Sequence, residues 1–218
     1  MSAPLTHSSF VDVRRRHILI VGIFDVLDRS GVRPVAANHM HMIWYLANAL
    51  APAWGIKPFD SALLKTEHQP YFPSLQSDLE CLVGMGMLVV TALAPQISQG
   101  RLQARFELNR LFADRVLSTM SEIEEETNIL NFLDEVVQAS NRLSEAEQSI
   151  ALSKDATYGD PSVEIGNVVD LGEWLKVDQL TPTADVLRRI GCISEREMKP
   201  AEAMDIYVDH LGRRLQHG

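Results

Sequence analysis

Cysteine is scarce in this chain of 218 residues, which contains two, Cys81 and Cys192. A chain of this length can bury a hydrophobic core without disulfide bonds. Each cysteine lies in an apolar segment with helical spacing, where a free cysteine usually behaves as a small buried hydrophobe. The sequence therefore predicts buried, reduced thiols and a reducing compartment, and we expect a cytoplasmic protein.

Long hydrophobic runs are missing as well. No window approaches the roughly 20 apolar residues of a membrane-spanning helix. Residues 1–9 lack the basic start and the apolar stretch of a secretion signal. We therefore expect neither a secreted protein nor an integral membrane protein.

Positive charge is the third shortage, since 20 Lys and Arg residues stand against 29 Asp and Glu residues, a formal net charge of -9. General affinity for nucleic acid draws on Lys and Arg side chains that displace counterions from phosphates. This balance argues against such affinity. It favours a basic protein surface as the partner.

Motifs for nucleotide binding and metal binding are lacking too. There is no P-loop, and Gly84 and Gly86 follow a predicted helix without the third glycine of a dinucleotide fingerprint. His39 and His41 are two residues apart, so on a helix they point in different directions and cannot share a zinc ion. We expect no cofactor and no metal ion.

Acidic side chains gather in a turn-rich segment, where Asp155, Asp160, Glu164 and Asp170 follow one another. A cluster of carboxylates can bind a cation or perform acid-base catalysis. Their spacing is equally typical of loop capping, and no nucleophile motif accompanies them. We expect no catalytic residue, and an enzyme that uses these carboxylates is the last alternative.

The first half of the chain shows three helical segments followed by two strand-like ones. Residues 18–27 are almost wholly apolar, and their length favours a buried helix, although residues 18–24 alone could form a strand. Residues 40–50 have helical periodicity, and residues 73–84 form a third periodic segment that ends at glycines. Residues 87–93 and 101–108 read as strands joined by a turn. Three helices and then a hairpin is the order of a winged helix.

The charges on these elements favour a protein partner over DNA. The third helix carries Asp78 and Glu80 and no basic residue, and the hairpin offers Arg101 and Arg105. A helix that enters a DNA groove needs positive side chains. A degenerate winged helix that contacts protein is therefore the favoured interpretation.

Two further surfaces are candidates for partner binding. Along the second helix, uncharged polar residues recur every three or four positions and predict one hydrogen-bonding stripe. Residues 109–139 predict one long helix or two stacked ones, with a break at Ser121, because Ser121 and Glu124 have capping-box spacing. The exposed face of this helical segment must be acidic. Such a face suits either a solvated surface or a docking strip for a basic partner. The stripe consists of Asn38, His41, Tyr45 and Asn48, and the acidic residues are Glu122, Glu124, Glu125 and Glu126.

These observations predict a mainly α fold with a small β hairpin. The N-terminal winged-helix-like domain spans 11–108, and a long helical segment follows at 109–153. A turn-rich linker and C-terminal helices occupy 154–218, with helices that begin at Thr181-Pro182 and near Pro200.

The chain resembles a known group of proteins in residues 44–47 (WYLA), 71–79 (YFPSLQSDL) and 82–88 (LVGMGML). These segments are similar to the winged-helix-containing middle components of ABC-type three-component systems, of which the C subunit of Lamassu anti-phage defence is one. The aromatic-Pro-Ser cue also occurs in small antitoxin and adaptor domains that resemble SocA. Residues 158–171 resemble a turn-plus-strand block of the same middle components.

The resemblance covers about half of the chain and implies a non-catalytic accessory subunit in a hetero-oligomer. Such a subunit bridges an ATPase of the structural-maintenance-of-chromosomes (SMC) type and an effector such as a nuclease. Family members of this kind have no catalytic residues to carry over. The alternatives are a winged-helix partner of a kleisin in a condensin-type complex, and a winged-helix protein of the antitoxin or transcription-regulator type.

Overall fold

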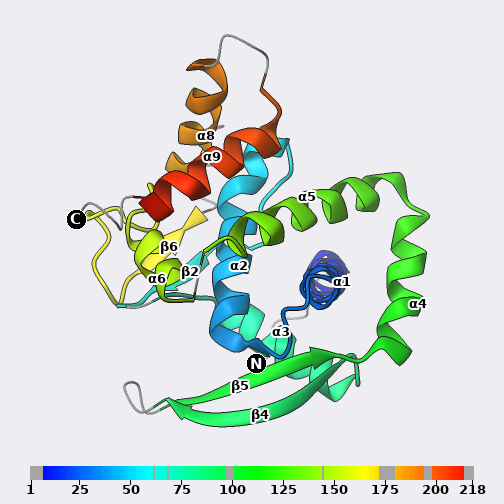
Figure 1. The fold of residues 1–218 in the computed structure, drawn as a ribbon. Helices are drawn as coiled ribbons and strands as arrows, with labels where there is room; N and C mark the ends of the chain where they lie inside the picture. Colours follow the sequence, from blue (N-terminus) through cyan, green and yellow to red (C-terminus); the bar gives the residue numbers. More distant parts are fainter. Residues whose placement is uncertain are drawn as a thin grey trace. The chain divides into compact units, whose positions relative to one another are not determined.

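A computed structural model describes residues 7–60, 62–67, 69–96, 101–143, 145–171, 180–193 and 198–213. Helices account for most of these residues, and the strands form two small antiparallel sheets (Figure 1). The expected mainly helical class is thereby confirmed. No helix in the described part is long and apolar enough to cross a membrane.

The chain divides into two compact units, and each is described by itself. Unit 1 comprises residues 1–37 and 74–131, and unit 2 comprises residues 38–73 and 132–218. This division differs from the sequence-based boundaries at residues 108 and 153. The long helix α5 (Glu124–Ser140) contributes its first half to unit 1 and its second half to unit 2.

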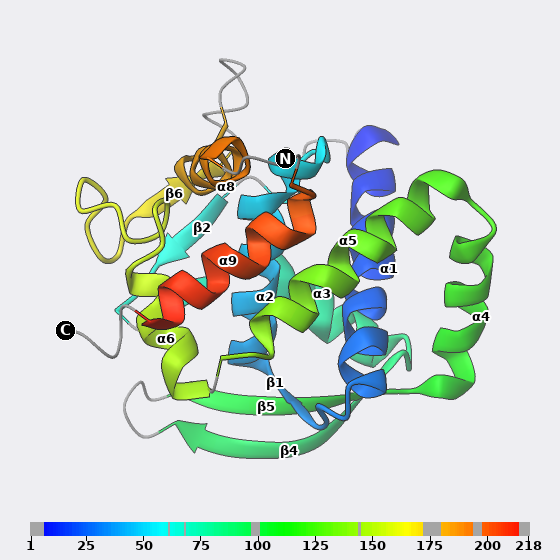
Figure 2. The same ribbon diagram turned by 45° about the horizontal axis from the view of Figure 1, so that its top comes forward.

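Unit 1 contains a three-stranded sheet in which β5 lies between β1 and β4 (Figure 2). The register aligns Val35 with Phe106, and Leu88 with Leu108. A bulge interrupts the β4–β5 ladder between Val90 and Ala92. The elements of this unit, besides the first half of α5, are α1 (His7–Arg29), β1 (Val35–Ala36), α3 (Pro73–Gly84), β4 (Leu88–Gln96), β5 (Arg101–Leu108) and α4 (Arg110–Ser121).

The core of unit 1 is formed around α1, which is longer than the predicted segment 18–27. The apolar side chains of α1 between Leu19 and Leu27 are buried. Among them, Phe24 packs edge-on against Phe106 of β5 with ring centroids 6.4 Å apart. A Cβ at Gly22 would approach Leu130 Cδ2 of α5 to 2.7 Å, so α1 packs closely on α5 there and a larger residue would require Leu130 to shift. The buried apolar side chains of α1 are Leu19, Ile20, Val21, Ile23, Phe24, Val26 and Leu27.

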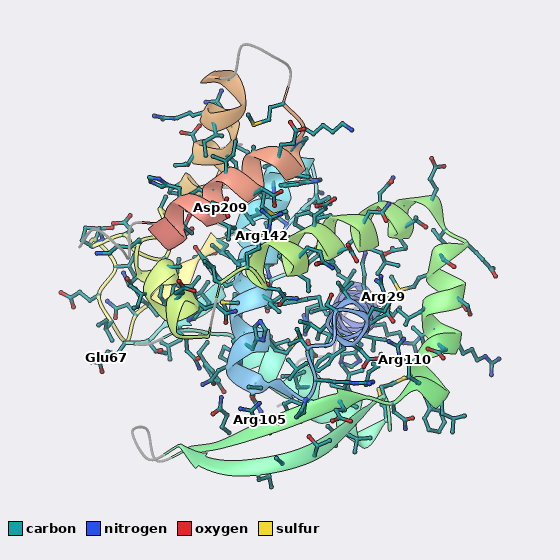
Figure 3. All side chains as sticks on the ribbon, in the orientation of Figure 1. Arg29, Glu67, Arg105, Arg110, Arg142 and Asp209 are labelled. Carbon is teal, nitrogen blue, oxygen red and sulfur yellow. The ribbon has the colours of Figure 1, made fainter. Side chains whose placement is uncertain are left out.

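Ion pairs attach three further helices to α1. Arg16 Nε donates to Asp78 Oδ2 of α3 at 2.8 Å, and Arg15 approaches Glu125 and Glu126 of α5 at 3.1 Å each. On α4, Arg110, which is labelled in Figure 3, forms ion pairs with Asp25 and Asp28. These two carboxylates also pair with Arg29 and Arg33 respectively. Arg15 and Arg16, which make two of these contacts, lie within α1.

Unit 2 contains α2 (Ala37–Leu50), a second sheet and the C-terminal helices. The sheet has the order β3-β2-β6 and aligns Leu63 with Val169. The rings of Trp44, Trp54, Phe59 and Phe132 lie together in unit 2, with centroid separations of 5.1 to 6.4 Å; Trp44 and Phe132 are buried, and Trp54 and Phe59 are half-buried. The other elements are the 3-10 helix η1 (Ala51–Trp54), β2 (Ala62–Lys65), β3 (Pro70–Tyr71), α6 (Glu145–Ser153), β6 (Val168–Asp170), α8 (Pro182–Ile193) and α9 (Pro200–Arg213).

Most predicted helix and strand positions are confirmed, but two local details are wrong. The helical segment does break at Ser121, yet the Ser121 hydroxyl donates to the Ser118 carbonyl at 2.8 Å instead of forming a capping box with Glu124. Both Cys81 and Cys192 are exposed, because each lies on the outer face of its helix. The predicted N-cap at Thr181 is confirmed, since its hydroxyl accepts from Ala184 N at 3.2 Å.

Leu79 on the inner face of α3 tests the core of unit 1. Its side chain is fully buried, so Leu79→Asp places an unpaired charge among apolar side chains and should reduce the free energy of unfolding by about 3 kcal/mol or more. Ser77→Asp puts the same residue on the exposed face of the same helix and should change stability by less than about 0.5 kcal/mol. Urea denaturation of both variants checks this, and equal losses would contradict the assigned faces.

Candidate functional site

The polar stripe on α2 lies inside unit 2. His41, Tyr45 and Asn48 are buried, and Asn38 is half-buried. Three of the four predicted partner-binding residues of the stripe are therefore not exposed on the surface of unit 2. Helical periodicity places the four residues on one face correctly, but a face of hydrogen-bonding groups can be satisfied by the chain itself.

Intrachain hydrogen bonds account for these stripe residues. Phe72 N donates to His41 Nδ1 at 3.1 Å, and Gln69 Nε2 donates to Asn38 Oδ1 at 2.6 Å. Asn48 Oδ1 accepts from Asp60 N at 2.7 Å, while its Nδ2 donates to the Trp44 carbonyl. The stripe thus anchors the chain between α2 and α3, which contains η1, β2 and β3.

The fourth member of the stripe, Tyr45, donates its hydroxyl proton to a buried carboxylate, Asp155. Asp155 is only 2% exposed and lies two residues after the end of α6. Tyr207 of α9 donates to its Oδ2 at 2.6 Å, and the amides of Thr157 and Tyr158 donate to its Oδ1 at 2.9 and 2.8 Å. Elements far apart in the sequence therefore meet at one side chain.

Thr183, at the start of α8, completes this arrangement. Its hydroxyl lies 2.9 and 3.0 Å from the two oxygens of Asp155 and 2.7 Å from the Thr157 hydroxyl. Thr183 N in turn donates to Thr157 Oγ1 at 3.0 Å. We call these five residues the Asp155 cluster: Tyr45, Asp155, Thr157, Thr183 and Tyr207.

Burial and charge shift the acidities of the surrounding phenols. Burial raises the pKa of Tyr45 well above its usual value, and the negative charge of Asp155 raises it further. The same two causes, in the same order, raise the pKa of Tyr207. Burial also raises the pKa of Tyr158 to about 12, although its hydrogen bonds with Thr66 act in the opposite direction.

The Asp155 cluster is a closed structural centre. All of its members are buried, and every oxygen of the carboxylate already accepts hydrogen bonds. The other acidic residues of the turn-rich segment do not join it: Asp160 caps the amide of Ser162, and Glu164 is exposed. Within the described residues no three His, Cys, Asp or Glu side chains gather as a metal site would require.

The acidic residues predicted to form a docking strip lie at the junction of α4 and α5. Glu122, Glu124 and Glu125 are exposed, and Glu126 is half-buried. Three of them occupy the first turn of α5, where negative charge is favoured by the helix dipole. Glu125 and Glu126 pair with Arg15. Of the four acidic residues, Glu122 and Glu124 therefore face solvent without an ion pair to any described residue.

Exposed apolar side chains on unit 1 were not predicted from the sequence. Leu111 and Phe112, in the first turn of α4, are 81% and 48% exposed, and Met85 after α3 is 57% exposed. Phe112 lies against Gly86, 3.8 Å from the position of a Cβ there. Val89 and Leu93 on β4 are exposed too. The apolar periodicity of these segments is the same for buried and exposed positions, so it could not distinguish these residues from core residues.

The electrostatic argument against DNA contact through α3 rests on fewer charges than the sequence suggested. Asp78 is buried and pairs with Arg16 and His17 of α1. The exposed positions of α3 include Ser77, Glu80 and Cys81. The helix still contributes no positive side chain, which a groove-reading helix would need.

No protein-family model, no curated protein and no solved structure matches this chain.

Asp155 supports a prediction about the stability of unit 2. Asp155→Ala removes the acceptor of two phenols and two amides, and buried donors without acceptors are costly. We expect a loss of about 3 kcal/mol or more in the free energy of unfolding. Asp160→Ala, which removes a surface carboxylate from the same segment, should cost less than about 1 kcal/mol. Similar losses in urea denaturation would show that Asp155 is not the centre of the cluster.

A second prediction concerns alkaline pH. The folded-state pKa values of Tyr45, Tyr158 and Tyr207 are raised above the unfolded-state value of about 10. The free energy that these protonated phenols contribute to folding is therefore fully present below about pH 10. Above it the unfolded chain loses protons that the folded chain keeps, and stability falls by up to roughly 1.4 kcal/mol per pH unit for each tyrosine. For Tyr158 this window runs from about 10 to about 12.

Urea denaturation between pH 8 and 11, combined with phenolate absorbance, tests this pH dependence. Tyr207→Phe should reduce the slope of stability against pH above 10, because one raised pKa is removed. Ionisation of all tyrosines near pH 10 while the protein stays folded would contradict the buried positions of these phenols.

Proposed function

We propose that this protein is a non-catalytic adaptor subunit of an anti-phage defence complex, in which it bridges an SMC-like ATPase and an effector such as a nuclease. The proposal combines the sequence resemblance with one structural observation. The polar groups best suited to chemistry are enclosed and paired inside unit 2, whereas unit 1 exposes apolar side chains at the start of α4. Exposed apolar side chains that lie together mark protein contact sites.

A winged-helix arrangement is part of this proposal. The order α1, β1, α2, α3, β4, β5 and the sheet order β1-β5-β4 support it, because a winged helix has one short strand between its first two helices and a hairpin after its third. The β2–β3 segment is then an insertion between the second and third helices. In this proposal the domain contacts protein rather than DNA, since α3 lacks positive side chains.

The proposed contact surface has an apolar centre and an acidic edge. Leu111 and Phe112 begin α4, and Glu122 and Glu124 follow at its far end. Apolar side chains supply most of the binding free energy at such interfaces, while charges at the rim govern the rate of encounter and the choice of partner. A partner with a basic rim around an apolar pocket fits these features.

Co-purification from the native host tests this proposal with matched variants. Leu111→Lys should abolish recovery of the partner, because it places a charge at the centre of the contact, and Glu122→Lys combined with Glu124→Lys should weaken recovery at low salt. Neither should change folding, since all three side chains are exposed. Ile165→Lys exchanges a similarly exposed apolar residue of unit 2 and should recover the partner as the wild type does.

Two outcomes would contradict the adaptor function. One is recovery of the wild-type protein alone under mild conditions. The other is equal recovery of the same partner by the wild type and by the Leu111→Lys variant, which would move the contact away from α4.

A further inference from the structure

The strand β4 has an edge without a partner strand in the described part of the chain. In the sheet order β1-β5-β4, only β5 lies beside it. At nine residues β4 is the longest strand described. The backbone groups along such an edge can form hydrogen bonds with another strand, as the free edge of any sheet can.

The register of the hairpin indicates which groups are available. Asn109 N donates to the Met87 carbonyl at 2.8 Å, so residue 87 turns its backbone groups toward the β5 side. In an antiparallel pair successive residues alternate in this respect. Leu88 and Val90, which align with Leu108 and Phe106, therefore direct their N–H and C=O groups away from β5.

The sequence of β4 has two of the features that protect such edges, a bulge and a proline, but no charge. Natural sheets block exposed edges with charged side chains, proline or bulges. β4 (LVVTALAPQ) contains no charged residue. It has a bulge between Val90 and Ala92 and a proline at position 95 near its end. Val89, Val90 and Leu93 expose 47%, 38% and 63% of their surface, so the edge is both apolar and uncharged.

The exposed side chains of β4 continue the core of unit 1. Leu88 and Val90 align with Leu108 and Phe106 and share their face of the sheet, and Phe106 packs on Phe24 of α1. After the bulge Leu93, aligned with Ala104, returns to this face. The face is thus buried at the Leu88 end and uncovered at the Leu93 end. A strand added at the edge would bring further side chains to cover it.

We propose that the edge of β4 pairs with the same edge of a second copy of this chain, forming an antiparallel six-stranded sheet across a two-fold axis. An antiparallel pair of identical strands satisfies its own symmetry, because each copy offers the same groups to the other. The absence of charge on β4 means that no like charges face each other across the new pair of strands.

The distribution of charge in the chain favours this contact over one through unit 2. Residues 1–37 and 74–131 contain nine Arg and eleven Asp and Glu residues, a formal charge of -2, so -7 of the total of -9 belongs to the remainder. Two copies that meet through unit 1 therefore bring together nearly neutral parts. This inference stands independently of the adaptor function.

Sedimentation velocity of the full-length protein over a range of concentrations tests the pairing. The wild type should change from monomer to dimer as concentration rises. Leu93→Lys puts a charge on the apolar edge strand of each copy and should raise the dissociation constant of the dimer by roughly tenfold or more. Leu111→Lys, the same exchange at a more exposed apolar residue of unit 1, should leave the dissociation constant unchanged.

Hydrogen exchange at low and high protein concentration identifies the interface. The backbone amides of Leu88, Val90 and Leu93 should exchange more slowly at high concentration if β4 forms the contact. A wild type that stays monomeric, a dimer that Leu93→Lys does not weaken, or protection confined to other segments would overturn the proposal.

The same variants separate this inference from the adaptor function. Leu111→Lys should lose the partner protein but still dimerise, and Leu93→Lys should do the reverse. A monomeric wild type whose Leu93→Lys variant fails to recover the partner would show that β4 pairs with that partner instead, which overturns the second-copy contact and leaves the adaptor function standing.

Discussion

A carboxylate removed from water must be surrounded by hydrogen-bond donors, and each unit of this protein is organised around one such carboxylate. In unit 2 the carboxylate is Asp155, with phenol, hydroxyl and amide donors from four parts of the chain. In unit 1 it is Asp78, which receives Arg16 and His17 of α1. The helices of each unit are therefore positioned by a polar contact as well as by apolar packing.

The two buried carboxylates use different donors, and this difference affects what each unit can tolerate. Asp78 is paired with a guanidinium group, so its negative charge is balanced by a positive one. The donors to Asp155 are neutral, and they stabilise it through the number of hydrogen bonds rather than through an opposite charge. Such an arrangement holds only while every donor is correctly placed, which demands a precise junction of α2, α8, α9 and the segment after α6.

Local sequence patterns predicted the helices well because caps and apolar spacing are short-range signals. The proline and threonine at the start of α8 and the glycine at the end of α3 identified those ends. The same patterns could not assign Tyr45 and Asp155 to each other, since 110 residues separate them. A stripe of polar side chains looks the same in a sequence whether it faces solvent or the interior. For the same reason the turn-rich segment at 154–170 read as a linker although Asp155 lies within it.

Exposure was the property least accessible from the sequence, and the proposed contacts depend on it. Cys81 and Leu111 both lie in helices with clear apolar periodicity, yet both side chains face solvent. Periodicity identifies the apolar side of a helix. The length of that side that neighbouring elements cover depends on tertiary packing. An apolar residue just beyond the covered region, such as Leu93 at the end of a partly buried sheet face, is then left exposed. The polar interior of unit 2 is closed by its own hydrogen bonds, whereas the ends of α4 and β4 in unit 1 leave apolar side chains uncovered.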